Sequence, residues 1–234
     1  PDTARLLSRR VKTASIRTLA YGEVLRLGSS ELSFHPSGHM LGAAQVRIES
    51  PDGTAVVTGD FKRQADPSGL PFAPQACDEL VCESTFAFPG LRFPAPELVI
   101  EAIRAWWRGA AEQGRGCVLF CHVCGKAQRV LASLDRGERA RVLVHGEIGD
   151  VNRLYRARGC GWAEAELATL GRGRRAFPGA LVLAPASPFG RHWAKRIDGA
   201  LFGHASGWAA PEFAAQHQAG EAQFVLSDHA DWQA

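Results

Sequence analysis

The chain has 234 residues, of which 46% are hydrophobic and 22% are charged, and its formal net charge is +3. These values are typical of a globular protein with one large domain or two modest ones, and they exclude a disordered chain. No apolar run approaches the length of a membrane span and the N-terminus lacks a signal-peptide pattern. We therefore expect a cytoplasmic protein without a membrane partner.

A β-hairpin is predicted within SFHPSGHMLGAAQVRIESPDGTAVVTGDF, residues 33–61. Two runs rich in β-branched residues flank PDG, a short turn typical of antiparallel strands. Pairing about this turn places Ala44 near Asp60, so we expect His39 and Asp60 at the same end of the strand pair. Zinc and other borderline divalent metals accept both side chains. The hairpin alone also suits a loop histidine and a turn aspartate, and both interpretations stay open.

From about residue 95 the chain alternates predicted helices and strands. The helical patterns are PELVIEAIRAWWRGAAEQG, GKAQRVLASL, GDVNRLYRARG and PFGRHWAKRI, and the strand patterns are CVLFC, RVLVHG, ALVLAPA and FVLSDH. Such alternation favours a parallel sheet covered by helices, whose functional groups collect beyond the carboxyl ends of the strands. Polar residues stand after predicted strands at Glu83, His122, Lys126, His145, Asp228 and His229.

The six cysteines are predicted to be free thiols, because several lie in apolar, strand-like runs. CHVC, residues 121–124, is a single C-x-x-C without the second pair of a zinc ribbon. Charge is uneven along the chain: residues 121–180 carry eleven Lys or Arg against six acids, a local net charge of +5. A basic region favours a polyanionic partner, although a solvated arginine-rich surface explains the same composition.

In this order, the motifs resemble those of the metallo-β-lactamase fold nucleases of the β-CASP group. HPSGHMLGAAQV with His39 looks like the third metal motif of that family, and TGDFKR with Asp60 looks like the fourth. CESTF with Glu83 and SDHADW with His229 resemble the first and second β-CASP motifs. GKAQRV resembles the GxxQ helix start of the family. Among its subgroups, GKAQRV, FGHASGW and SDHADW together look most like the bacterial exonucleases encoded beside an ATP-dependent DNA ligase, in the Artemis-like group.

The resemblance implies an α/β fold: a partial metallo-β-lactamase αββα sandwich with an inserted β-CASP α/β domain. Residues 1–90 would belong to the first domain, residues 91–210 to the β-CASP domain, and residues 211–234 would return to the first. The HxHxDH motif and the third β-CASP motif are absent from these 234 residues. We therefore expect a piece of a longer product that, as written, binds metal poorly and is inactive.

The resemblance also implies the chemistry of the site. Two divalent metals, zinc or alternatively manganese, would activate water and neutralise the phosphate. Asp60 would bridge the metals and His39 would complete the shell of one of them. Glu83 would orient His229, which would bind the scissile phosphate or protonate the leaving group, and Asp228 is an alternative orienting acid.

Nucleic acid is the expected partner, as single-stranded or end-containing DNA, with an ATP-dependent DNA ligase and a helicase as further partners. The leading hypothesis is a metal-dependent DNA exonuclease of bacterial DNA repair. An RNA-processing nuclease of the same fold and a non-catalytic nucleic-acid-binding scaffold are the alternatives. The candidate nucleic-acid contacts, each of which also suits a surface or packing role, are Lys62, Arg63, Lys126, Arg129, Ser206 and Trp208.

Overall fold

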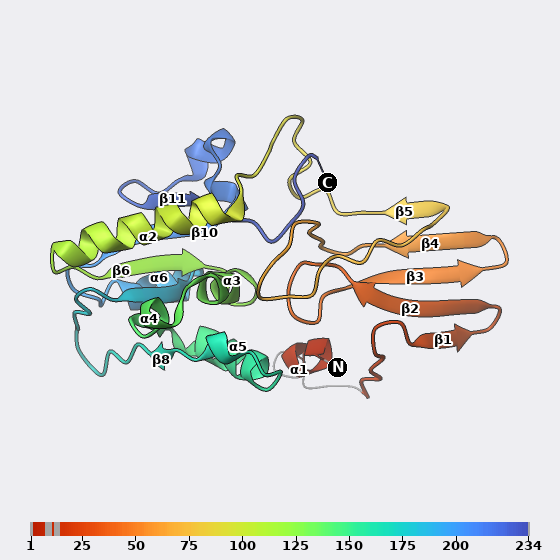
Figure 1. Cartoon of the computed structure of the whole chain (residues 1–234), viewed down its shortest axis with the longest axis horizontal. Coiled ribbons are helices and arrows are strands. Elements are labelled where there is room, and N and C mark those ends of the chain that lie inside the picture. Colours follow the sequence, from red (N-terminus) through yellow and green to blue (C-terminus); the bar gives the residue numbers. More distant parts are fainter. Residues whose placement is uncertain (1, 8–10, 12–14, 234) are drawn as a thin grey trace. The chain divides into compact units, whose positions relative to one another are not determined.

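The computed structural model describes residues 2–7, 11 and 15–233. The chain divides into two compact units, one made of residues 1–92 and 228–234 and the other of residues 93–227. Each unit contains one β-sheet, and helices are most extensive in the second (Figure 1). The expected mixed α/β class is confirmed.

The sheet of the first unit has the strand order β1-β2-β3-β4-β5. Neighbouring strands are antiparallel from β1 to β4, whereas β5 lies parallel to β4. A short helix, α1, precedes the sheet. The bounds are Asp2–Leu7 for α1, Val24–Leu27 for β1, Ser30–Pro36 for β2, Ala44–Ser50 for β3, Gly53–Val57 for β4 and Glu79–Val81 for β5.

The predicted hairpin is formed by β3 and β4, but its register is tighter than the sequence suggested. Ser50 pairs with Gly53 and Val46 pairs with Val57. Only two residues separate the strands, because Gly53 adopts a positive φ of 138° and enters the ladder directly. The expected placement of Ala44 near Asp60 within the ladder was therefore wrong by one position, and Asp60 lies beyond the end of β4.

The sheet of the second unit has the order β11-β10-β6-β9-β7-β8, and all its paired strands are parallel. Three short 3₁₀ segments accompany the helices. The helices are α2 Pro96–Glu112, α3 Lys126–Ser133, α4 Arg136–Arg139, α5 Gly146–Arg156 and α6 Pro188–Ala194, with η1 Gly161–Ala163, η2 Gly207–Ala209 and η3 Pro211–Gln216. The strands are β6 Cys117–Cys121, β7 Val142–Val144, β8 Glu166–Leu167, β9 Leu181–Pro185, β10 Leu201–Ser206 and β11 Ala222–Val225.

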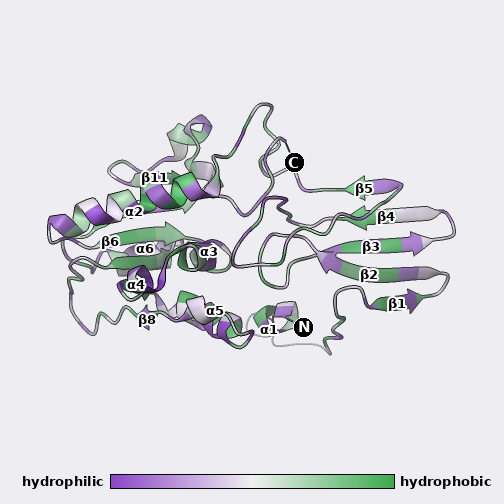
Figure 2. Cartoon of the chain, viewed as in Figure 1, coloured by the Kyte–Doolittle hydropathy of each residue, from purple (hydrophilic) through white to green (hydrophobic). Residues whose placement is uncertain are grey.

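The core of the second unit lies on both faces of this sheet. Every residue of β6 is buried, and the strand is hydrophobic along its length (Figure 2). Cys117, Leu119 and Cys121 pack into one apolar cluster with residues of α2, α3 and α5, whereas Val118 and Phe120 pack into another with residues from the end of α6. A central strand with two buried faces explains the uninterrupted apolar run CVLFC.

The chain returns to the first unit near its C-terminal end. β11 pairs in parallel with β10, which keeps residues 211–227 in the second unit, and the return begins at Asp228. Buried apolar residues are few in the described part of the first unit: Leu19, Val56, Phe86 and Leu91. None of the helices within residues 2–7, 11 and 15–233 has the length and apolar character needed to cross a membrane.

All six cysteines are free thiols, and their exposure predicts an order of reactivity. Burial raises the pKa of both Cys117 and Cys121 to about 12, whereas Cys82 is exposed. At pH 8 a thiol with a pKa of about 12 is only about one part in ten thousand thiolate. Titration with a disulfide reagent should modify Cys82 first and leave Cys117 and Cys121 unmodified until denaturant is added. Cys82→Ser should remove the fast phase, and rapid native modification of all six thiols would contradict the buried placement.

Candidate metal and catalytic site

His39 is held in a tight loop between β2 and β3. Gly38, the residue before it, has a φ of +75°, a conformation that favours glycine. A Cβ atom at Gly38 would lie 2.0 Å from the backbone oxygen of Lys62, so the loop can approach Lys62 this closely only with glycine here. The amide of Lys62 in turn donates to the Ser37 carbonyl over 2.9 Å.

Asp60 lies in the neighbouring loop after β4, and Ser37 connects the two loops. The Ser37 hydroxyl donates to the backbone carbonyl of Asp60 over 2.8 Å. Because Asp60 is fixed through its backbone, its carboxylate stays accessible, with 56% of the side chain exposed. His39 itself is buried. The two loops therefore bring one buried imidazole and one accessible carboxylate together.

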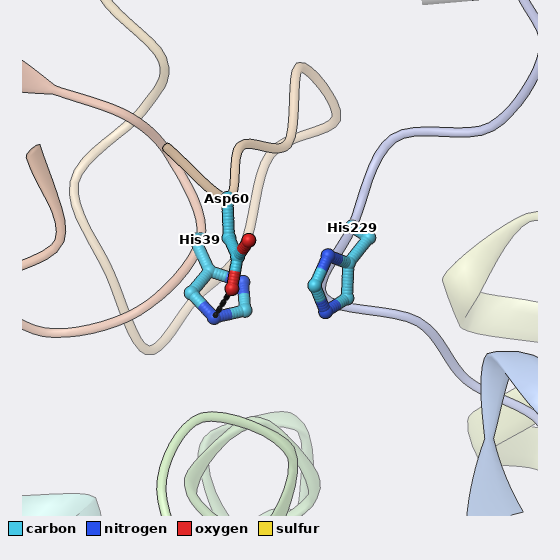
Figure 3. A group of neighbouring side chains, drawn as sticks. All are labelled: His39, Asp60 and His229. Atoms are coloured by element: carbon cyan, nitrogen blue, oxygen red, sulfur yellow. Dashed lines mark ion pairs between the residues drawn. The ribbon is translucent and has the colours of Figure 1, made fainter. Parts of the chain in front are cut away.

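The hydrogen bond of His39 determines which ring nitrogen faces Asp60. His39 Nδ1 lies 2.8 Å from the carbonyl oxygen of Asp228, and since a carbonyl only accepts, Nδ1 carries the proton. His39 Nε2 then has the free lone pair, and it lies 3.8 Å from Asp60 Oδ2 (Figure 3). This separation is too long for a hydrogen bond.

Glu83 and His229 form a second pair. His229 Nδ1 lies 2.8 Å and 3.0 Å from the two carboxylate oxygens of Glu83, and the Phe61 amide donates to Glu83 Oε1 over 2.8 Å. Asp228 Oδ1, the alternative orienting acid, is 3.7 Å from His229 Nε2, beyond hydrogen-bonding distance. Of these two acids, Glu83 is therefore the one that is hydrogen-bonded to His229. Phe86 packs edge-on against the His229 ring, at 5.8 Å between centroids.

Burial alone would raise the pKa of the Glu83 carboxyl. Hydrogen bonds from His229, Thr85 and the Phe61 amide, together with the charge of His229, outweigh burial and lower this pKa. Glu83 is thus held as a carboxylate, and it can accept a hydrogen bond from the protonated Nδ1 of His229.

His39, Asp60 and His229 form a group in which one possible ligand atom from each lies within 4.8 Å of the others (Figure 3). Within the described residues it is the one such group of three or more. Two ligands of a tetrahedral zinc lie about 3.3 Å apart, so a modest contraction would let Asp60 and His39 share an ion. Three protein ligands suit one metal with an open position and are too few for two. His229 thus qualifies as a metal ligand as well as a proton carrier, a role that its sequence motif did not predict.

Three of the residues predicted to contact nucleic acid are buried. The side chains of Lys62, Lys126 and Arg129 lie buried, with only 3%, 6% and 1% of the residue exposed. Side chains buried to this degree do not suit direct contact with a phosphate backbone. Arg63 is exposed and Trp208 is 39% exposed, so both remain accessible.

The GKAQR segment of α3 has a structural role. The Gln128 side chain accepts from the Gly125 amide over 2.8 Å and donates to Asn152 over 3.0 Å, so it closes the start of the helix. Arg129 Nη1 donates to the carbonyl of Ser227 over 2.6 Å. Ser227 is the residue immediately before Asp228 and His229. Ser206, another expected contact, caps η2 by accepting from the Trp208 amide.

The comparisons with known proteins connect the chain to nucleases. No family model matches it. A protein named "Probable DNA ligase" from Opitutus terrae is 30% identical over 237 residues, which cover 99% of this chain and 22% of that protein. The protein named "Endoribonuclease YSH1" from Yarrowia lipolytica is 29% identical over 122 residues, 51% of this chain and 14% of that protein. The chain thus spans less than a quarter of the length of either relative.

A solved structure supports the fold. A protein of unknown function from Enterococcus faecalis V583 matches with a TM-score of 0.57 and 14% identity, over 94% of this chain and 57% of that chain. At this identity the likeness concerns the fold alone. The expectation that the chain is related to nucleases is confirmed by the sequence relatives, whereas a relationship to one bacterial exonuclease group stays a prediction.

Arg129→Met should destabilise the second unit. The substitution removes a charged hydrogen bond and leaves the Ser227 carbonyl without this donor, which costs about 1.5–3 kcal/mol in the free energy of unfolding. Urea denaturation would measure the change. Arg108→Met on the exposed face of α2 is the matched control and should change the free energy by less than about 0.5 kcal/mol. Equal stabilities of the two variants would contradict a positioning role for Arg129.

Glu83→Gln should reduce stability in a pH-dependent way. A lowered pKa in the folded state gives stability that is present above the unfolded value of about 4.3 and is lost as pH falls through the folded value. The wild-type chain should therefore exceed Glu83→Gln by about 1.5–3 kcal/mol near neutral pH, and by progressively less below about pH 4.5. Urea titrations across this range, with exposed Glu79→Gln as the control, would test it. A difference that stays constant down to the lowest pH would oppose the proposed pairing.

Proposed function

We propose that this chain is part of a metal-dependent phosphodiesterase of the metallo-β-lactamase β-CASP type, acting as an exonuclease on DNA. The observation that carries the proposal is the convergence of His39, Asp60 and His229 within 4.8 Å, with both histidines held through Nδ1. Buried acceptors on Nδ1 are the usual way in which proteins orient imidazoles toward a metal. These hydrogen bonds account for the orientation of both histidine rings, so core packing is not needed to explain it.

Each residue of the site would have a separate role in hydrolysis. A divalent metal, when bound, would lower the pKa of water and neutralise charge on the phosphate. His39 and Asp60 would hold such an ion through Nε2 and a carboxylate oxygen. Glu83 keeps His229 protonated on Nδ1 and orients its Nε2, where a proton can be held for the leaving oxygen. Phe86, which is buried, shields one side of that ring from water.

DNA is proposed as the substrate because the relative that matches 99% of this chain is named a probable DNA ligase. A nuclease that acts beside a ligase in repair, with a helicase as a further partner, is the corresponding biological setting. The relative named an endoribonuclease supports the alternative, an RNA-processing nuclease with the same site. Phosphodiester chemistry barely distinguishes the two, so the choice rests on substrate recognition.

The test combines metal binding with cleavage. Zinc or manganese affinity would be measured calorimetrically for the full-length protein that contains this chain and for its His39→Ala and Asp60→Asn variants. Cleavage by the same proteins would be followed with end-labelled single-stranded DNA and RNA of the same sequence. Asp60→Asn should weaken metal binding and lower cleavage about a thousandfold, because the carboxylate is both ligand and charge. Asp52→Asn, in the exposed turn of the same hairpin, is the matched control.

Chelator-sensitive cleavage of DNA that Asp60→Asn abolishes and Asp52→Asn leaves intact would support the proposal. Faster cleavage of RNA than of DNA would favour the ribonuclease alternative. A full-length protein that binds metal through Asp60 yet cleaves neither polymer would refute catalysis and leave the nucleic-acid-binding scaffold.

A further inference from the structure

A group of basic residues lies in the second unit, outside the motifs of the candidate site. It comprises the loop 169–175 between β8 and β9 and the segment 195–198 that follows α6. We call these two segments the cationic patch. They carry five cations, Arg172, Arg174, Arg175, Lys195 and Arg196, and one carboxylate, Asp198.

Backbone hydrogen bonds join the two segments of the cationic patch. The Arg175 amide donates to the Arg196 carbonyl over 3.0 Å, and the Asp198 amide donates to the Arg175 carbonyl over 3.0 Å. These bonds form an isolated parallel bridge between Arg175 and Ile197. Ile197 is buried in the apolar cluster on one face of the sheet, so the bridge ties the patch to the core.

Arg196 fixes the shape of the loop. Its Nη2 donates to the carbonyl oxygens of Gly171 over 2.7 Å and Gly173 over 2.9 Å. The loop thus wraps around one guanidinium group, and Arg172 stands between the two glycines whose carbonyls are held. A glycine on each side leaves the Arg172 side chain without bulky neighbours.

The other arginines of the patch are also ordered. Arg175 donates to the Thr169 carbonyl over 2.9 Å and lies 5.1 Å from the Phe177 ring centroid, and Arg174 forms an ion pair with Asp198. The exposed cations Arg172 and Lys195 have no side-chain hydrogen bond or ion pair within the described part of the chain. Four net positive charges are therefore held on two joined segments, although like charges repel.

We infer that the cationic patch binds the phosphate backbone of a nucleic acid; the choice of this polyanion rests on the proposed nuclease function. Arg172 and Lys195 would contact phosphates directly, while Arg174, Arg175 and Arg196 order the loop and add to its positive field. An anionic membrane fits less well, because none of the large exposed hydrophobic residues of the described chain belongs to the patch. Backbone contacts of this kind position a strand without reading its sequence.

The test compares Arg172→Ala/Lys195→Ala with the wild-type chain and with Arg108→Ala/Arg136→Ala. The control pair removes two exposed cations from other elements of the same unit, so both variants have the same net charge. Binding of a fluorescein-labelled oligothymidylate would be measured by anisotropy between about 50 and 200 mM salt. Thermal melting would confirm that both variants are folded.

Loss of two phosphate contacts should make the slope of log K against log salt shallower by about 1.4, since each single-strand contact contributes about 0.7. The control should keep most of the wild-type slope. Equal slopes for the two variants would overturn the inference. Phosphatidylserine vesicles give the second arm: patch-dependent binding to vesicles with unchanged DNA binding would also overturn it. Cleavage is measured separately with Asp60→Asn, so failure of the patch and failure of the nuclease proposal remain distinguishable.

Discussion

The first unit depends on the hydrogen bonds that capture the chain when it returns at residue 228. His39 and Asp228 are 189 positions apart in sequence, and the bond between them closes the unit. Four consecutive residues are held in turn: the Ser227 carbonyl by Arg129, the Asp228 carbonyl by His39, the His229 ring by Glu83 and the Ala230 amide by the Phe61 carbonyl. Because described buried apolar residues are few in the first unit, this polar network supplies much of its long-range order.

The same network determines the chemistry that the site can perform. In both His39 and His229, Nδ1 lies within hydrogen-bonding distance of the residue that orients the ring. Nε2 is the nitrogen that we assign to metal binding or proton transfer. If His39 turned its ring over, the bond to the Asp228 carbonyl would be lost inside the protein, where an unpaired carbonyl costs about 1–3 kcal/mol. Structural and functional requirements therefore coincide in His39. Asp60 differs, because only its backbone is tied to Ser37 and its carboxylate is left to respond to an ion.

The sequence predicted the elements that follow local rules, and it missed what depends on distant contacts. The apolar run CVLFC indicated a buried parallel strand correctly, because both faces of β6 are covered. The predicted register of the hairpin was wrong, because the register depends on the φ angle of Gly53 and the sequence PDG does not specify that angle. The close approach of His39 and Asp60 was anticipated from the strand ends. The contribution of Ser37 was not, because a serine hydroxyl that joins two loops has no sequence signal.

The number of basic residues in the sequence overstates the number that the structure leaves available for contacts with a partner. A count of cations between residues 121 and 180 treats each one as a surface charge, yet many of them support the backbone. Arginines that donate to backbone carbonyls or pair with acids in this region include Arg129, Arg139, Arg141, Arg153, Arg174 and Arg175. Arg141 also lies 5.3 Å from the Trp107 ring centroid, where its charge is partly balanced by the aromatic face.

Arginine suits this supporting role because its planar group can hold two carbonyls at once, as Arg196 does, without losing its charge. A cation used in this way still contributes to the field around it. The guanidinium that shapes the loop at Gly171 and Gly173 is therefore part of the same positive surface as Arg172. A polyanion would encounter a surface already ordered before binding, so less conformational entropy would be lost than if long side chains on a flexible loop had to be fixed at the moment of contact.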